Sequence, residues 1–377
     1  MELSMIIFLL VFFCLYGGIN FYAFSRAINI FHFSGIAQVI IIFVMILLIL
    51  APLAVRLMET VHLETWARII AYIGYIWMAF VFLFFFLSVT FDIVRYLYKL
   101  VGHGSGAAHL NTIAFGLAVF LALFFVIYGF FDARRIRVKN LEVHAEQVLP
   151  NNGKIRIVQI SDVHLGIIIR EKRLADILDK VKEANPDILV STGDLLDGEI
   201  DNMLPEAQQL AAINPKYGKY AIMGNHEYYA GIKLSMEFTR NAGFVILRDE
   251  AVQVAGINIF GADDITGRRS GMTKDNPRFQ KLLAERSDNF VLLLKHQPYV
   301  NDREKFNLQI SGHTHGGQIF PFELVTRFFF PRNYGYYKLG ENRLLYVSRG
   351  AGTWGPPVRL FAPPEITVID IIGKKAE

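Results

Sequence analysis

Four long stretches without a charged side chain constrain how the first third of the chain can fold. They run from Leu3 to Ser25, Ser34 to Val55, Ile69 to Phe91 and Leu110 to Phe131, and each has at least 22 residues. About 20 apolar residues are enough for a helix to cross the hydrocarbon core of a bilayer. We therefore predict four transmembrane helices, at about 3–25, 34–55, 69–91 and 110–131.

The composition of these stretches favours an anchor. The first stretch lacks a basic segment before it and the small-residue cleavage site of a signal peptide, so we interpret it as a retained helix. None of the four has an acid or base away from its ends, whereas a transporter usually needs a polar site at mid-membrane. The single cysteine, Cys14, lies in an apolar run and allows no disulfide within the chain.

The charge content changes abruptly after the fourth stretch. Residues 1–133 hold five basic and five acidic side chains, whereas the remaining 244 residues hold 33 and 29. The second part therefore has the composition of a water-soluble domain, and it is long enough for one substantial core. Neither the formal charge of +4 nor any basic stripe points to a nucleic-acid partner. We divide the chain into a transmembrane region (1–133), a basic linker with an edge strand (134–153) and a catalytic domain (154–377).

The distribution of Lys and Arg between the loops predicts the orientation in the membrane. With the N-terminus inside, six basic residues fall on the inner side: Arg56, Arg68, Arg134, Arg135, Arg137 and Lys139. Three fall on the outer side: Arg26, Arg95 and Lys99. Because basic loops favour the cytoplasmic side, we predict a multi-pass protein of the inner (plasma) membrane with a cytoplasmic catalytic domain.

The second half repeats one pattern, a short apolar run followed by a polar tip. The runs that carry tips are residues 155–160, 188–190, 219–223, 291–294 and 308–310. The earlier runs alternate with helical segments, which predicts parallel βαβ units, and later runs without helices predict antiparallel additions. We expect two packed mixed sheets with helices outside, and an edge strand over 141–148 that turns back at Asn151 and Asn152. In such α/β layers, ligands bind at the carboxyl ends of strands.

Seven side chains on these tips are able to bind a metal: Asp162, His164, Asp194, Asn225, His296, His313 and His315. Oxygen and imidazole ligands together suit Mn²⁺, Fe or Zn²⁺ better than Ca²⁺. Seven are too many for one transition metal, so two ions sharing Asp194 is the economical arrangement. Two ions about 3.5–4 Å apart clamp a phosphoryl group and activate a water as hydroxide, which attacks the phosphorus in line with the ester oxygen. A histidine that binds no metal is the natural proton donor for the leaving group.

These residues fall into blocks that resemble the calcineurin-like metallophosphoesterases. The blocks are Asp162-x-His164, Gly193-Asp194-x-x-Asp197, Gly224-Asn225-His226-Glu227, His296, and Gly312-His313-x-His315. Five blocks in family order are highly specific, and the resemblance covers residues 155–371. It implies a four-layer α/β/β/α sandwich. The segments 312–318 and 348–365 are similar to a membrane-associated bacterial subgroup with N-terminal transmembrane helices, which implies a lipid or envelope phosphate as substrate.

The resemblance also implies roles for single residues. One ion would be held by Asp162, His164, Asp194 and His315, and a second by Asp194, Asn225, His296 and His313. His226 would orient the phosphate or protonate the leaving group, and Asp197 would be a carboxylate that supports His226 or a ligand. For Asp197 and Glu227, a purely structural or capping role explains the residue type equally well.

An aromatic stretch, residues 320–337, is the least ordinary part of the second half. Phe320 and Phe322 are equally well explained as core-strand residues. Phe328, Phe329 and Phe330 show no alternation and precede a proline, so we predict a loop that dips into the bilayer and admits a lipid phosphate. Arg349 and Arg359 would bind a phosphate or headgroup, with a structural salt bridge as an equal alternative.

The sequence therefore predicts a membrane-anchored, two-metal hydrolase acting on a phosphodiester or pyrophosphate of a membrane lipid or envelope component. The partners implied are the bilayer and a phosphate-bearing substrate. The rival from another class is a membrane sensor or scaffold that binds metal and phosphate without turnover.

Overall fold

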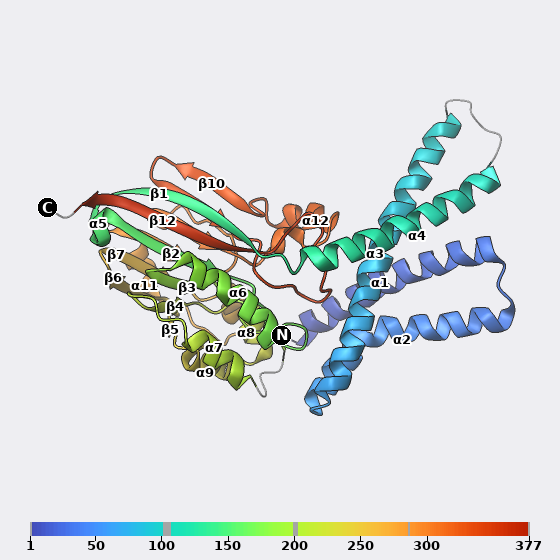
Figure 1. Cartoon of the computed structure of the whole chain (residues 1–377), viewed down its shortest axis with the longest axis horizontal. Helices are drawn as coiled ribbons and strands as arrows, with labels where there is room; N and C mark the ends of the chain where they lie inside the picture. Colours follow the sequence, from blue (N-terminus) through green and yellow to red (C-terminus); the bar gives the residue numbers. More distant parts are fainter. Residues whose placement is uncertain (1, 101–106, 199–202, 286, 376–377) are drawn as a thin grey trace. The chain divides into compact units, whose positions relative to one another are not determined.

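The computed structural model describes residues 2–100, 107–198, 203–285 and 287–375 (Figure 1). The chain divides into two compact units. One comprises Met1–Phe131 together with the short segment Gly355–Leu360, and the other comprises Asp132–Trp354 and Phe361–Glu377. Residues 101–106, which include His103 and Gly106, lie outside the described residues.

The first unit contains four helices long and apolar enough to cross a membrane: α1 (Glu2–Phe31), α2 (Gly35–Thr60), α3 (Glu64–Leu100) and α4 (Ala107–Asp132). They run beyond the uncharged stretches, so that Arg26 and Asp92 lie inside helices and not in loops. This is because an α-helix satisfies its own backbone hydrogen bonds wherever it continues. The carboxylate of Asp92 receives the guanidinium groups of Arg26 at 3.2 Å and Arg95 at 3.3 Å, which offsets their charges within the unit.

Small residues allow two of these helices to approach closely. A Cβ atom added to Gly74 on α3 would lie 2.4 Å from the Cβ atom of Ala51 on α2. Elsewhere in the unit, the indole of Trp77 donates a hydrogen bond to the fully buried amide of Asn20 at 2.9 Å. Helix association in lipid depends on such packing and polar contacts, because apolar surface gains little by leaving lipid.

We predict that Gly74→Ala destabilises the helical unit, because the new methyl group has no room beside Ala51. Overpacking of this kind costs about 1–3 kcal/mol. Gly116→Ala on α4 is the matched control, since a Cβ atom there has nothing within 4 Å. Thermal unfolding in detergent, followed by tryptophan fluorescence, measures both variants. An unchanged transition for Gly74→Ala would show that α2 and α3 do not pack as described.

The second unit is built on two six-stranded mixed sheets. The first sheet has the order β1 (Arg137–Leu149), β12 (Glu365–Lys375), β2 (Lys154–Ile160), β3 (Ile188–Ser191), β4 (Lys219–Ala221) and β5 (Val245–Ile246). The second has the order β10 (Gly335–Gly340), β11 (Arg343–Val347), β9 (Leu308–Ser311), β8 (Phe290–Leu294), β7 (Ile257–Gly261) and β6 (Glu250–Val254). Within them, β2 to β5 are parallel, and so are β7, β8, β9 and β11.

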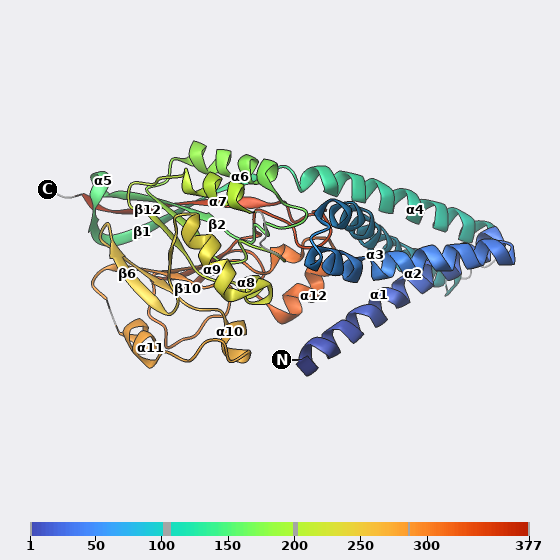
Figure 2. The same cartoon turned by 90° about the horizontal axis from the view of Figure 1, so that it is seen from below.

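The two sheets pack face to face, and helices cover their outer faces (Figure 2). Buried side chains such as Ile157, Leu292 and Ile369 fill the space between the sheets. Helices α6 (Glu171–Ala184), α7 (Leu204–Ala211) and α9 (Ile232–Asn241) cover the first sheet, and α11 (Pro277–Ala284) covers the second. The predicted four-layer α/β/β/α sandwich is therefore confirmed. Five short elements complete the unit: α5 (Pro150–Gly153), α8 (Asn225–Ala230), α10 (Ile265–Arg269), the 3₁₀ turn η1 (His315–Gly317) and α12 (Phe322–Phe329).

Strand pairing at the edge of the first sheet differs from the sequence prediction. The turn at Asn151 and Asn152 exists, with both residues left-handed, but it does not close a hairpin. Instead β12 lies between β1 and β2, parallel to the first and antiparallel to the second. The reason lies in burial: β12 is buried on both faces along most of its length, which suits a central strand, whereas β1 is largely exposed and suits an edge.

The aromatic stretch also differs from its prediction. Residues 322–329 form the helix α12, so the predicted loop over Phe328 and Phe329 is wrong. The core-strand alternative for Phe320 and Phe322 is wrong as well, because both side chains are more than 40% exposed. Three consecutive phenylalanines conceal a helical period when the residues are read only as apolar or polar, because no polar residue interrupts them.

Candidate metal centre

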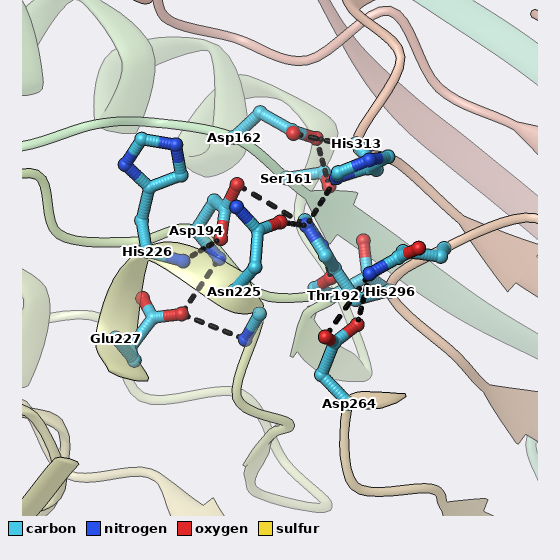
Figure 3. Close-up of polar contacts among 12 residues, drawn as sticks. Ser161, Asp162, Thr192, Asp194, Asn225, His226, Glu227, Asp264, His296 and His313 are labelled. Carbon is cyan, nitrogen blue, oxygen red and sulfur yellow. Dashed lines mark hydrogen bonds and ion pairs between the residues drawn. The ribbon is translucent and has the colours of Figure 1, made fainter. Parts of the chain in front are cut away.

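Five strand ends bring the polar tips together at one edge of the two sheets. Strands β2, β3 and β4 carry the tips that begin at Ser161, Gly193 and Gly224. Strands β8 and β9 carry the tips that hold His296 and His313. Because these strands are parallel within each sheet, their carboxyl ends share an edge. Figure 3 shows how the side chains of the two groups face one another.

The backbone at these tips is held in an uncommon conformation. Positive φ angles occur at 51° for Asp162, 54° for His164, 51° for Asp194, 74° for His313 and 51° for His315. Each of these non-glycine residues pays an energetic cost in the left-handed region, and such residues cluster at functional sites. Five of the seven predicted ligands therefore share a strained backbone.

Two glycines permit the tips to touch. A Cβ atom at Gly224 would lie 2.2 Å from Oδ1 of Asp194, and one at Gly312 would lie 2.2 Å from Oδ2 of Asp162. Neither contact is possible for a residue with a side chain unless the carboxylate moves. Gly224 and Gly312 are therefore required, because each lies against a predicted ligand from another strand end.

The first group of side chains joins the β2 and β9 tips. Nε2 of His164 lies 3.0 Å from Nε2 of His315, and Nε2 of His315 lies 3.5 Å from Oδ1 of Asp162. All three residues are buried. Buried imidazole nitrogens at this distance repel one another if both present lone pairs or both present protons, and a cation between lone pairs removes that conflict. The donor set therefore fits a metal ion.

The second group joins the β3, β4, β8 and β9 tips. Nε2 of His296 lies 3.1 Å from Oδ2 of Asp194 and 3.1 Å from Oδ1 of Asn225. Nδ1 of His313 lies 3.2 Å from the same Nε2 atom. The other ring nitrogen of His296, Nδ1, donates its proton to the carbonyl of Thr192 at 2.8 Å. The lone pair of Nε2 is then the one that is able to bind a metal.

The titration of the histidines divides them by environment. Burial lowers the pKa of His164 to about 4 and that of His313 to about 3, and positively charged neighbours act in the same direction. Both are therefore neutral at pH 7, which is the form that binds metal. Burial also acts to lower the pKa of His296, but the carboxylate of Asp194 outweighs it and raises that pKa. A metal ion would occupy the place of that proton.

His226 has a different set of contacts. Its Nδ1 atom lies 2.9 Å from Oδ1 of Asp197, and its backbone N–H donates to Oδ1 of Asp194 at 2.9 Å. Burial acts to lower its pKa, but the negative charges of Asp194 and Asp197 raise it to about 9. His226 is therefore cationic at neutral pH, and Asp197 holds one of its two ring nitrogens.

Glu227 links the β3 and β4 tips through hydrogen bonds to their backbone. Its fully buried carboxylate accepts four backbone N–H groups: those of Asp194 at 3.0 Å, Leu195 at 2.6 Å, Leu196 at 3.1 Å and Gly224 at 2.7 Å. The two tips carry the predicted ligands Asp194 and Asn225. We therefore infer that Glu227 positions these two ligands without touching the metal. Its role is structural, and it serves the functional site.

The predicted substrate residues lie in different surroundings. Arg349 forms an ion pair with the buried Glu365 at 3.0 Å and lies over the ring of Tyr334 at 4.0 Å. Arg359 is fully buried in the short segment that groups with the helices, where its N–H donates to Gly129 at 2.9 Å. Neither arrangement tests phosphate binding, so both remain predictions.

Three aromatic rings border the site. Phe330, which the sequence singled out, lies 5.0 Å from the His313 ring. Tyr229 and Trp354, which it did not, lie 5.5 Å and 5.9 Å from the His226 ring. Tyr229 follows His226 by three residues, so a helix beginning at Asn225 would have indicated their proximity. No local pattern connects Trp354 to His226.

We predict that Glu227→Gln weakens the site without removing a ligand, because an amide presents an N–H group where two backbone N–H groups need an acceptor. Each unsatisfied buried donor costs about 1–3 kcal/mol. The thermal transition should fall by at least about 4 °C, and Mn²⁺ should bind more weakly in calorimetry. Glu237→Gln, at an exposed position of α9, is the matched control. Wild-type Mn²⁺ affinity in Glu227→Gln would contradict the positioning role.

Comparison with known proteins adds a family assignment to this geometry. The family model described as calcineurin-like phosphoesterase matches residues 155–317, which include all seven predicted ligands. An uncharacterized metallophosphoesterase of Aquifex aeolicus is 38% identical over 261 residues, covering 68% of this chain and 99% of that protein. An uncharacterized metallophosphoesterase of Campylobacter jejuni is 32% identical over 382 residues, covering 98% and 99%.

The name of one similar vertebrate protein mentions both a transmembrane region and a metallophosphoesterase domain. A Danio rerio protein named "transmembrane protein with metallophosphoesterase domain" is 30% identical over 311 residues, covering 77% of this chain and 70% of that protein. The similarity to the Campylobacter jejuni protein extends over nearly the whole length of both chains, the apolar helices included.

Proposed function

Since the chain belongs to the calcineurin-like metallophosphoesterases, we propose that it is a membrane-anchored hydrolase that uses two divalent metal ions to cleave a phosphodiester or pyrophosphate. Phosphoric-ester hydrolysis and divalent metal ions follow from the family. The number of ions, the bond cleaved and the substrate are the proposal. The observation that carries it is the convergence of seven buried or half-buried metal-binding side chains at one edge of the sheets.

The contacts favour one division of these ligands between two ions. Asp162, His164 and His315 form one compact group, and Asp194, His296 and His313 form another. Adding Asp194 to the first group and Asn225 to the second gives each ion four protein ligands, with Asp194 shared. When bound, such a pair of ions polarises the phosphoryl group and lowers the pKa of a water molecule. The mixed imidazole and oxygen set suits Mn²⁺, Fe or Zn²⁺.

His226 is left to handle the proton. It is also close enough to His164 and Asp194 to complete a third metal-binding group, so its role has to be argued from its partners. The carboxylate of Asp197 holds Nδ1 of the ring at 2.9 Å, which favours the protonated imidazole, and the division of ligands above assigns His226 to neither ion. A cationic imidazole beside the phosphoryl position can stabilise negative charge and then donate its proton to the leaving oxygen.

Hydrolysis of a soluble diester tests the proposal. With Mn²⁺, the full-length protein should cleave bis(p-nitrophenyl) phosphate, and a chelator should abolish the reaction. Asp194→Asn and His226→Ala should each lower kcat by about 10²–10⁴-fold, since a shared ligand or a proton donor is lost. His144→Ala is the control, because this side chain is 78% exposed on β1 and forms an ion pair with Glu142 at 3.5 Å.

Two results would contradict the proposal. Wild-type activity in both site variants would place the chemistry elsewhere. Binding of Mn²⁺ and phosphate by the wild-type protein, without cleavage of mono- or diesters, would favour the sensor or scaffold.

The four apolar helices support a substrate that lies in or at a membrane. We propose a lipid or envelope phosphate, with the catalytic domain on the cytoplasmic side of the inner (plasma) membrane. Reporter fusions at Gly106 and at the C-terminus should report opposite faces, with the C-terminus inside. An extracytoplasmic C-terminal reporter would overturn the orientation.

A further inference from the structure

Helix α12 presents an apolar face to its surroundings. Phe328 is 81% exposed, and Phe329 and Leu324 are each 63% exposed. The exposed large apolar residues of this region are Phe320, Phe322, Leu324, Val325, Phe328, Phe329, Trp354 and Phe361. No residue of α12 itself is buried. Large contiguous apolar surfaces are rare on soluble domains and mark sites of interaction.

The polar side of α12 is fixed to the catalytic domain. A Cβ atom on Gly317 of η1 would lie 2.3 Å from the Cα atom of Glu323, so the helix begins in direct contact with the metal-binding loop. Arg327 pairs with Glu323 at 2.7 Å along the helix and lies 5.5 Å from the ring of Tyr334. The apolar face is therefore held outward by the polar one.

The apolar surface is continuous with the walls of the metal centre. Phe330, the residue after α12, turns inward to His313 and to Tyr299, whose ring lies at 5.3 Å. On the other side, Gln318 holds Trp354 by two hydrogen bonds of 2.8 Å and 2.9 Å. Trp354 in turn contacts His226. The three consecutive phenylalanines thus differ: two face outward and the third borders the metal site.

The chain itself indicates what this face meets. Helix α4 is long and apolar enough to cross a membrane and ends at Asp132, and β1 begins at Arg137. Only residues 133–136 lie between the end of α4 and the start of β1, so the catalytic domain follows almost directly on a helix that is able to span a membrane. A short amphipathic helix with phenylalanine and leucine on one side and arginine on the other is typical of elements that lie in a membrane interface.

We propose that α12 is an interfacial helix that inserts its apolar face into the bilayer and holds the acyl part of a lipid phosphoester beside the metal centre. Phe330 and Trp354 then form the walls between which the phosphate passes from the interface to the metal-binding side chains. The substrate class is an amphiphilic lipid phosphoester embedded in a bilayer. This rests on the proposed function for its catalytic part, whereas insertion of α12 is independent of catalysis.

A fluorescent label tests insertion directly. In a Cys14→Ser background, which removes the single cysteine, Leu324→Cys and Leu282→Cys each receive an NBD label. Leu282 is the matched control, because it is 45% exposed on the eight-residue helix α11. In phosphatidylcholine–phosphatidylglycerol nanodiscs, doxyl-labelled lipids should quench the label at position 324 at least twofold more than the label at position 282. Equal quenching would overturn the proposal. Blue-shifted emission at position 324 without lipid quenching would overturn it too, in favour of a second copy or another protein.

A substrate comparison tests the catalytic part. Leu324→Ser should lower the ratio of lipid-phosphoester hydrolysis in nanodiscs to bis(p-nitrophenyl) phosphate hydrolysis by at least tenfold, whereas Leu282→Ser should leave that ratio unchanged. An unchanged ratio for Leu324→Ser would overturn the acyl-binding role. Failure of the wild-type protein to cleave either substrate would instead count against the proposed function, and the quenching result would still decide whether α12 inserts.

Discussion

The second unit is organised around many metal-binding side chains that its fold buries in one place. The cost of burying their charged groups would be offset by a bound cation. Two carboxylates, four imidazoles and one amide are gathered from five strand ends into a largely buried volume. Imidazole nitrogens stand 3.0 Å and 3.2 Å apart in two places. Burial of two carboxylates in a low-dielectric interior is costly, and a cation bound between these groups would offset that cost. The sandwich supplies enough buried apolar surface to hold them there.

The same constraint explains the backbone conformation at the strand ends and the residues that support the metal-binding side chains. Left-handed backbone at five predicted ligands turns their side chains inward at the strand ends, and glycines at 224 and 312 leave room for neighbouring carboxylates. Glu227 then holds the β3 and β4 tips by four backbone N–H groups. Asp197 supports His226 through its side chain, by a contact of 2.9 Å with Nδ1 of the ring. Metal-binding groups and their supports are therefore parts of one arrangement, in which the supports fix orientation.

The sequence predicted the features that depend on local pattern. Apolar runs followed by polar tips located β2, β3, β4, β8 and β9, and parallel pairing then implied that the tips converge. It did not predict that β12 separates β1 from β2, because that pairing joins residues more than 200 positions apart. Nor did it predict α12, whose three phenylalanines carry no polar interruption, or the contact of Trp354 with His226. Contacts of these kinds are decided by tertiary packing, which overrides local preference.

The central claim is that two ions are held by seven ligands while His226 binds neither. Metal stoichiometry of the purified full-length protein tests it most directly, by elemental analysis together with electron paramagnetic resonance after loading with Mn²⁺. The account predicts two spin-coupled Mn²⁺ ions per chain in the wild type and in His226→Ala, and loss of the coupled pair in Asp194→Asn. A single ion in the wild type, or loss of an ion in His226→Ala, would contradict it.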